Sequence, residues 1–362
     1  MRLFQNSALY PSYLQHFDGL AAGAVSFDDR LRVFMDDRFG VLHFLQPVID
    51  RSPDAFFTNA NDKTLQTYWA REHGMASASA SEDILLAQIE HHRADVFYNL
   101  DPIRYSSSFV RKLPGCVRKA VCWRAAPSGG VDLSAYDAVV SNFPSILDDW
   151  RRKGCSVAPF FPAIDPLMDQ YGRGDRPIDV LFVGGYSRHH SRRAGILERV
   201  AALAERRNVV FCLDASRLTQ LAETALGFLP PLKKHRRPRA ISKIARPPVF
   251  GRQLYDLIGR SKIVLNGAID MAGADRGNMR CFEAMGCGAL LVSDDGRYPE
   301  AMEPGVTIAT YGSPEEALTL IEERLADGDE SSRIASLGRE RVTAAYSKPL
   351  QWKSFVDLVG QL

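Results

Sequence analysis

Short apolar runs that alternate with helix-like segments constrain the fold of this chain most strongly. In the first half, each run is followed by Asn, Asp, Ser or Pro, and most runs are separated by a helical stretch such as SEDILLAQIEHHRA. The runs lie in RLFQN, DAFFTNAN, ADVFYNLDP, RKAVCWRAAP and YDAVVSNFP. Buried parallel strands joined by crossover helices have this pattern. We therefore predict an α/β fold.

The second half repeats the pattern. Its apolar runs lie in DVLFVGG, NVVFCLD, KIVLNGA, ALLVSDD and VTIATY. Its helix-like segments are SRRAGILERVAALAERR, RQLYDLIGR, NMRCFEAMG and SPEEALTLIEERLAD. Pro162, Pro166 and Pro177 make a continuous helix between the halves implausible. We predict two Rossmann-like domains facing each other across a cleft, over residues 1–165 and 166–345, with a C-terminal helix over 346–362 packing back on the first domain.

The overall composition is that of a soluble protein. The formal net charge is only +2 and 46% of the residues are hydrophobic, which argues against a general nucleic-acid binder. No apolar run reaches the roughly 18 residues of a membrane span, and the first residues lack a signal-peptide pattern. We expect a cytoplasmic protein.

One stretch departs from the α/β pattern. Residues 232–251, LKKHRRPRAISKIARPPVFG, are rich in Lys, Arg and Pro and show little helix or strand periodicity. Three interpretations stay open: a solvated mobile loop, a basic flap over a phosphate-bearing ligand, or a patch for anionic lipid that brings the protein to the inner face of a membrane.

The segment DRGNMRCFEAMGCGALLVSD, residues 275–294, carries the clearest chemical signal. A helix that begins near Asn278 directs unpaired N–H groups and a partial positive charge at whatever lies before it, which suits a phosphate or a sugar hydroxyl. Arg280 and Glu283 share one face of that helix. A guanidinium pairs with phosphate, and a carboxylate accepts hydrogen bonds from two ribose hydroxyls. The alternative is an intrahelical ion pair on a wet face.

Other candidates lie at strand ends, because ligands of open α/β sheets bind at the carboxyl ends of the strands. Turn and capping chemistry is the alternative for each. In the second half we expect a ligand that carries a phosphate and a sugar to be bound by Gly184, Gly185, Tyr186, Ser187, Arg188, Asn266, Arg276, Gly277 and Asn278.

In the first half, Asp101 and His16 are candidates for a base that takes a proton from an acceptor hydroxyl. An Asx turn or a helix cap explains either residue as well. Further polar candidates are Asn6, Ser7, Asn59, Asn61, Arg124, Ser141 and Asn142. We find no metal-binding or P-loop pattern, so we expect no metal and no cofactor.

The second half resembles the C-terminal domain of group 1 glycosyltransferases, in the branch that includes spore-maturation-type glycosyltransferases. The match rests on FEAMGCGALLVSD and, in order, on DVLFVGGYSRHHSRR, FGRQLYDLIGRSKIVLN, YGSPEEALTLIEERL and SLGRERVTAAYS, which together span about half of the chain.

The resemblance implies a GT-B fold, with a nucleotide sugar bound by the second domain and an acceptor by the first. Glu283 falls on the family's ribose-binding glutamate, and Arg280 on the arginine typical of the branch. Asp275 falls where many retaining relatives carry an acid near the sugar. The Arg/Lys pair that grips the diphosphate has no unambiguous match; Arg188, Arg193 and Arg252 are all eligible.

We therefore expect a metal-independent, retaining transferase that moves a sugar from a UDP- or GDP-linked donor to a glycan, lipid-linked or protein acceptor. Two other classes stay open. Nucleotide-sugar epimerases share the two-domain plan, and a binding protein without catalytic activity would keep only the donor pocket.

Overall fold

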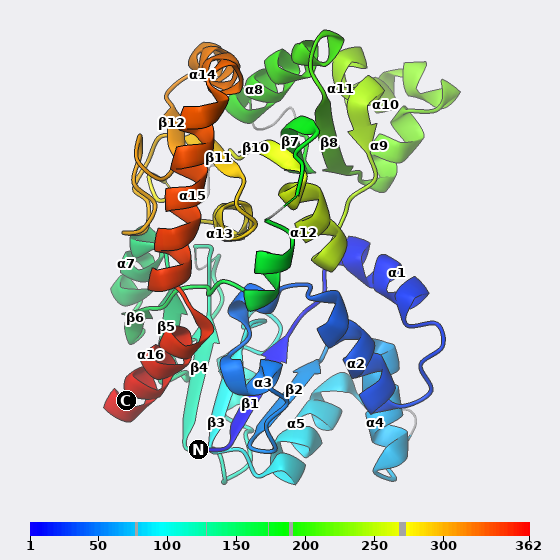
Figure 1. The fold of residues 1–362 in the computed structure, drawn as a ribbon. Helices are drawn as coiled ribbons and strands as arrows, with labels where there is room; N and C mark the ends of the chain where they lie inside the picture. Colours follow the sequence, from blue (N-terminus) through cyan, green and yellow to red (C-terminus); the bar gives the residue numbers. More distant parts are fainter. Residues whose placement is uncertain (77–78, 128, 173, 188–190, 268–272) are drawn as a thin grey trace. The chain divides into compact units, whose positions relative to one another are not determined.

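The computed structural model describes residues 1–362 except 77–78, 128, 173, 188–190 and 268–272. The chain forms two compact units (Figure 1). Unit 1 comprises residues 1–163 and 346–362, and unit 2 comprises residues 164–345. The second unit is thus inserted between two parts of the first. The predicted α/β fold is confirmed, because each unit contains a six-stranded parallel sheet with interleaved helices.

The sheet of unit 1 has the strand order β2-β1-β3-β4-β5-β6, and all of its pairs are parallel. Its strands are β1 (Leu3–Ser7), β2 (Ala55–Asn59), β3 (Val96–Asn99), β4 (Lys119–Trp123), β5 (Ala138–Ser141) and β6 (Val157–Pro159). Its helices are α1 (Pro11–Leu20), α2 (Phe27–Asp37), η1 (Val41–His43), α3 (Gln46–Ile49), α4 (Lys63–Glu72), α5 (Ser81–His92), α6 (Ser107–Val110), α7 (Pro144–Arg152) and α16 (Lys348–Gln361).

The sheet of unit 2 has the order β12-β11-β10-β7-β8-β9 and is also parallel. Its strands are β7 (Ile178–Gly185), β8 (Val209–Asp214), β9 (Ala245–Arg246), β10 (Ser261–Leu265), β11 (Leu290–Asp294) and β12 (Ala309–Tyr311). Its helices are η2 (Pro166–Gln170), α8 (Ser191–Ala202), η3 (Leu203–Glu205), α9 (Arg217–Ala222), η4 (Ala225–Phe228), α10 (Pro230–Lys233), α11 (Arg239–Ile244), α12 (Gly251–Gly259), α13 (Met279–Gly286), α14 (Pro314–Ala326) and α15 (Gly328–Ala345).

The interpretation of residues 232–251 as a stretch without regular structure is wrong. The segment contains the end of α10, all of α11 and the two-residue strand β9, which pairs with β8. Ile241 on α11 is fully buried in the core of unit 2. These elements are too short to show a helix or strand period, so the density of basic residues concealed them.

The last helix, α16, packs on unit 1 through a buried lysine. Lys348 is 3% exposed, and its Nζ donates hydrogen bonds to the carbonyl oxygens of Val41 at 2.7 Å, Leu42 at 3.0 Å and Phe44 at 2.9 Å. Gln351, one helical turn further on, donates to the carbonyls of Leu42 and Phe161. These bonds satisfy the buried ammonium group and fix the end of the chain against η1.

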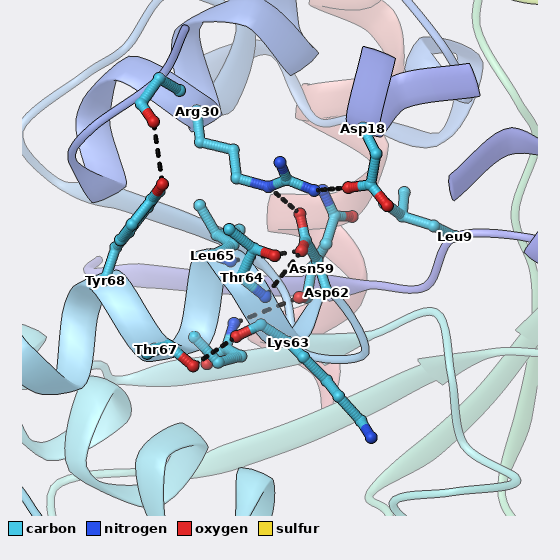
Figure 2. A network of polar contacts seen from close by, with 12 residues as sticks. Leu9, Asp18, Arg30, Asn59, Asp62, Lys63, Thr64, Leu65, Thr67 and Tyr68 are labelled. Atoms are coloured by element: carbon cyan, nitrogen blue, oxygen red, sulfur yellow. Dashed lines mark hydrogen bonds and ion pairs between the residues drawn. The ribbon is translucent and has the colours of Figure 1, made fainter. Parts of the chain in front are cut away.

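A buried arginine joins three segments of unit 1. Figure 2 shows Arg30 of α2 between Asp62 and Asp18. Its Nε lies 2.6 Å from Asp62 Oδ2, its Nη2 lies 2.5 Å from Asp18 Oδ1, and its guanidinium carbon lies 4.6 Å from the centre of the Phe17 ring. The other oxygen of Asp62 accepts from the backbone N–H groups of residues 64 and 65 and so caps α4. One carboxylate therefore satisfies both a helix end and a buried charge.

We expect Asp62→Ala to destabilise unit 1 by about 3 kcal/mol, because it removes the cap of α4 and leaves the buried Arg30 charge with only the half-exposed Asp18. All four tryptophans (Trp69, Trp123, Trp150 and Trp352) lie in unit 1. Tryptophan fluorescence during urea unfolding therefore reports on this unit. Asp148→Ala, which breaks an exposed ion pair on α7, is the control and should cost less than about 0.5 kcal/mol. Equal losses in the two variants would contradict the assigned role of Asp62.

A buried imidazole gives unit 1 a dependence on pH. Although part of His43 reaches solvent, its Nδ1 is buried and its ring lies 4.5 Å from that of Trp123. Burial and the nearby Lys348 charge lower the pKa of His43 from 6.5 to about 3. Below pH 6.5 the imidazole of His43 therefore binds a proton in the unfolded chain, whereas in the folded chain it binds one only near pH 3 and below.

We expect the free energy of unfolding of unit 1 to fall as the pH drops from 6.5 towards 3, with a contribution from His43 of up to about 1.4 kcal/mol per pH unit. The stabilisation is fully present above pH 6.5, because the pKa is lowered on folding. His43→Gln should remove this contribution, and urea unfolding followed by tryptophan fluorescence at a series of pH values measures it. An unchanged pH slope in the variant would show that His43 is not responsible.

Candidate functional site

The candidate site of unit 2 lies where β7, β10 and β11 end. The parallel register places the carboxyl ends of these strands at one edge of the sheet. Gly184 and Gly185 close β7, Asn266 follows β10, and Ser293 and Asp294 close β11. Helix α13 begins at Met279, directly after Asn278, as the sequence predicted.

Asn266 is the centre of a buried polar network at this edge. It is 6% exposed, and its Nδ2 donates to Ser293 Oγ at 2.9 Å. Its Oδ1 accepts from Asn278 Nδ2 at 3.2 Å, and its carbonyl accepts from the hydroxyl of Tyr311 at 2.6 Å. Asn266 thus connects β10 to β11, β12 and the start of α13. In this structure its side chain positions the turn before the helix.

Asp275 and Arg276, which were predicted to contact the donor, are engaged in ion pairs of the turn. Asp275 is 1% exposed and its Oδ1 lies 2.7 Å from Nη2 of Arg297. Nε of Arg276 lies 2.7 Å from Oδ2 of Asp294. Gly277 follows with φ +105°, a conformation that other residues rarely adopt. These contacts hold the turn before α13 in a fixed path.

Arg280 and Glu283 face each other on α13. Arg280 Nη1 lies 2.6 Å from Glu283 Oε2. Glu283 is only 9% exposed, and burial raises the pKa of its carboxyl group while the Arg280 charge lowers it. The intrahelical pair that we considered as an alternative does form, but it lies on a largely buried face and not on a wet one.

Gly286 allows α13 to pack closely against residues 164–168. A Cβ atom at Gly286 would lie 2.5 Å from Met168 Sδ and 3.3 Å from Ile164 Cδ1. A side chain at this position would therefore push α13 away from residues 164–168. The close approach fixes the helix that carries Arg280 and Glu283.

Arg193 of α8 is the most unusual side chain of the site. Its guanidinium lies 5.0 Å from the centre of the Phe182 ring. Its Nη2 is 2.5 Å from where a Cβ of Gly184 would be, and its Cγ is 3.9 Å from the corresponding position of Gly267. The side chain thus runs along the ends of β7 and β10. Its Nε is buried and has no hydrogen-bond partner among the described residues.

The surroundings of Arg193 disfavour its positive charge. Burial lowers the pKa of Arg193, the nearby Asp294 carboxylate raises it, and the nearby Arg280 lowers it further. Two guanidinium groups that repel each other in a partly buried setting favour an anion between them.

The remaining donor-side candidates are more peripheral. Tyr186 donates a hydrogen bond from its hydroxyl to Glu198 Oε1 at 2.6 Å, and Gly185 is exposed. Arg252, at the start of α12, donates from Nε to the hydroxyl of Tyr171. Arg188 lies outside the described residues. Of the two eligible arginines that the structure describes, Arg193 lies beside Gly184 and Arg252 contacts Tyr171.

Asp101 of unit 1 lies just after β3, beside two arginines. Its backbone N–H donates to Asn99 Oδ1 at 3.0 Å, and its Oδ2 is 3.6 Å from Arg104 Nε. Burial raises the pKa of Asp101, and the charges of Arg104 and Arg124 lower it. A carboxylate whose pKa is raised is a better base than an ordinary one. His16, the other predicted base, is a half-buried residue of α1 whose ring lies 6.1 Å from that of Tyr13.

Asparagines tie the strand ends of unit 1 together. Asn6 donates to Asn99 Oδ1 at 2.9 Å and accepts from the N–H of Ala60, while Asn61 exchanges two hydrogen bonds with the backbone of Leu9. Asn59 is fully buried, and neither polar atom of its side chain has a hydrogen-bond partner among the described residues. The other predicted polar residues, Ser7, Arg124, Ser141 and Asn142, also lie at or just after strand ends.

The tyrosines and the arginine that complete the donor-side network were not found from the sequence. Tyr311 ends β12, Tyr298 donates to the carbonyl of Asp294 at 2.6 Å, and Arg297 pairs with Asp275. Their sequence neighbourhoods carry no motif. The only signal is the position of Tyr311 at the end of an apolar run.

The described residues contain no group of three or more His, Cys, Asp or Glu side chains arranged to hold a metal ion. No helix among them is both long enough and apolar enough to span a bilayer.

Comparisons with known proteins agree with this architecture. Residues 192–350, a little under half of the chain, match a family model described as glycosyl transferase-like. A search of curated proteins found no match. Among solved structures, HepE of Anabaena in complex with UDP and glucose superposes with a TM-score of 0.60 at 14% identity, over 100% of both chains.

Two further structures show the same fold. Sucrose-phosphate synthase from Thermosynechococcus elongatus has a TM-score of 0.57 at 13% identity, over 99% of this chain and 98% of that one. The UDP-forming α,α-trehalose-phosphate synthase from Burkholderia xenovorans has a TM-score of 0.54 at 12% identity, over 98% of each chain. At these identities the likeness shows the fold, which is the GT-B fold of glycosyltransferases.

The matched family model and the fold together define the class of the protein. It is an enzyme of the glycosyltransferase type, and its glycosyl transferase-like segment, residues 192–350, contains Arg193, Asn266, Arg280 and Glu283.

Proposed function

We propose that the protein transfers a sugar from a nucleotide-linked donor, held by unit 2, to a glycan, lipid-linked or protein acceptor, held by unit 1. The observation that carries the proposal is the side chain of Arg193, which lies beside Gly184 and whose buried Nε has no hydrogen-bond partner among the described residues. A donor diphosphate between Arg193 and Arg280 would supply that partner and screen the repulsion between the two charges.

The same groups suit the chemistry of transfer. When the glycosidic bond of the donor breaks, negative charge accumulates on the leaving nucleoside diphosphate. Arg193, Arg280 and the N-terminus of the eight-residue helix α13 are fixed in the structure before reaction, so they stabilise that charge without reorganising. We propose that this stabilisation needs no bound metal and no other cofactor.

Glu283 is proposed to bind the ribose of the donor. Only Oε2 of its carboxylate is occupied by Arg280, which leaves Oε1 to accept a hydrogen bond from a ribose hydroxyl. The bond to Arg280 holds the carboxylate in one orientation. Arg280 therefore has two roles in the proposal: it attracts the diphosphate and positions the ribose-binding carboxylate.

Asp101 is the better supported of the two proposed bases, because burial raises the pKa of its carboxyl group and because it lies at a strand end. For Asp275, a contact with the transferred sugar requires that its pair with Arg297 opens. We also propose that transfer retains the anomeric configuration and that the protein belongs to the spore-maturation-type branch of group 1 glycosyltransferases. The UDP and UDP-glucose in the HepE structures make UDP the first nucleotide to test, with GDP as the alternative.

Glu283→Gln should weaken binding of a UDP-sugar roughly tenfold to a hundredfold, because it replaces a charged acceptor of a ribose hydroxyl by a neutral amide. Titration calorimetry with UDP-glucose and with GDP-mannose measures the effect. Glu330→Gln, which removes the acid of an exposed i,i+3 pair with Arg333 on α15, should leave binding unchanged. Wild-type affinity in Glu283→Gln would remove the proposed ribose contact.

Analysis of products separates the proposed activity from the two alternatives. Incubation with donor and a panel of acceptors should give a glycosylated acceptor and free nucleoside diphosphate. A new nucleotide sugar formed without any acceptor would identify an epimerase. Tight binding of the donor without turnover would identify a binding protein.

Gly184→Ala tests the position of Arg193. The added methyl group would lie 2.5 Å from Arg193 Nη2 and 3.2 Å from the Phe182 ring, so the flexible guanidinium should move away from the ring. We expect roughly tenfold weaker UDP binding and a loss of stability under about 1 kcal/mol. Gly195→Ala, two residues from Arg193 on α8, is the control, because its methyl group would lie 3.8 Å or more from any neighbour. Equal UDP affinity in both variants would argue against Arg193 as a diphosphate ligand.

A further inference from the structure

Large apolar side chains are exposed together on α9, η4 and the start of α10. Phe228 is 75% exposed, and its neighbours in the patch are about half exposed. We call this group the apolar patch; its members are Leu218, Leu221, Leu226, Phe228 and Leu229. Exposed apolar side chains that are scattered singly need no explanation, but a contiguous group on a soluble protein marks a surface that contacts something.

The apolar patch has a defined shape. Helices α9 and α10 both pack against η4 (Figure 1). A Cβ atom at Gly227 would lie 1.7 Å from the carbonyl oxygen of Ala222, so only glycine allows η4 to lie this close to the end of α9. The close approach turns Leu226 and Phe228 outward while Ala222 and Gly227 are buried.

Basic residues surround the apolar patch. Residues 217–246 contain eight Lys or Arg and a single acid, Glu223, which is bound to Arg237. The whole chain has a net charge of only +2, so the rest of it is net negative. The guanidinium carbon of Arg236 lies 4.3 Å from the centre of the Phe228 ring, which brings a cation directly onto the patch. Lys233, Lys234, Arg239 and Lys243 are exposed.

We propose that this surface binds the face of an anionic lipid bilayer. Leu and Phe side chains enter the boundary between headgroups and acyl chains, and the lysines and arginines around them pair with lipid phosphates. The protein would bind the membrane peripherally, through side chains of the short helices α9, η4 and α10. The proposal does not depend on the donor site, because none of its residues belongs to that site.

The positive charge around the apolar patch favours a membrane, and not a second copy of the chain, as the binding partner. In a symmetric dimer the same patch meets itself, so two clusters of positive charge would face each other. An anionic bilayer instead offers opposite charge and an apolar layer to the same surface.

Sedimentation with vesicles tests the proposal on the full-length protein. We expect binding to phosphatidylcholine vesicles that contain about 30–40% phosphatidylglycerol, and little binding to vesicles of pure phosphatidylcholine. The affinity for the anionic vesicles should fall as the salt concentration rises. The double variant Leu226→Ser/Phe228→Ser should lose binding. Lys233→Gln/Lys234→Gln should weaken it about tenfold or more.

Val25→Ser is the matched control, since Val25 is 69% exposed and lies in unit 1. It should bind vesicles like the wild type. All substituted side chains are exposed, so circular dichroism should show unchanged melting, and UDP binding should persist in every variant. Wild-type protein that ignores anionic vesicles, or serine variants that bind them equally well, would overturn the proposal. The proposal would also be overturned if the wild type were a dimer in analytical ultracentrifugation, the serine variant were a monomer, and neither bound vesicles.

Discussion

Parallel pairing of β7, β10 and β11 is the constraint on which the candidate site of unit 2 depends. Because three strands end at one edge, residues far apart in the sequence reach one another: Asn266 follows the second strand, Ser293 ends the third, and Arg193 runs past the end of the first. The Asn266 network then fixes the start of α13. Without that register, Arg280 would not lie near Arg193.

The site combines satisfied and unsatisfied charges. Asp275, Arg276, Asp294 and Arg297 neutralise one another in pairs and hold the turn. Arg193 stands apart, because burial and Arg280 both disfavour its charge while no described residue accepts a bond from its Nε. The paired groups hold the turn, whereas Arg193, whose Nε has no hydrogen-bond partner among the described residues, is the side chain that we propose to bind the donor diphosphate.

The sequence predicted most of the sheet correctly because the strands are short apolar runs that end in turn residues. It missed β6 and β9, which have only three and two residues, and it read α10 and α11 as irregular because these helices have only four and six residues and are rich in basic side chains. At the site, the start of α13 and the Arg280–Glu283 pair were predicted from spacing. The partners Arg297, Tyr298 and Tyr311 were not, because pairing across strands leaves no trace in local sequence. The ion pairs of Asp275 with Arg297 and of Arg276 with Asp294 could not be predicted from the sequence for the same reason.

The anchoring of Lys348 has a consequence for how the chain is made. Unit 1 is assembled from the first 163 residues and the last 17, whereas unit 2 is continuous. On a ribosome, unit 2 has all of its residues before unit 1 has its last helix. The carbonyls of Val41, Leu42 and Phe44 therefore lack their ammonium partner until Lys348 has been synthesised, so unit 1 gains these hydrogen bonds only after all of unit 2 has been made.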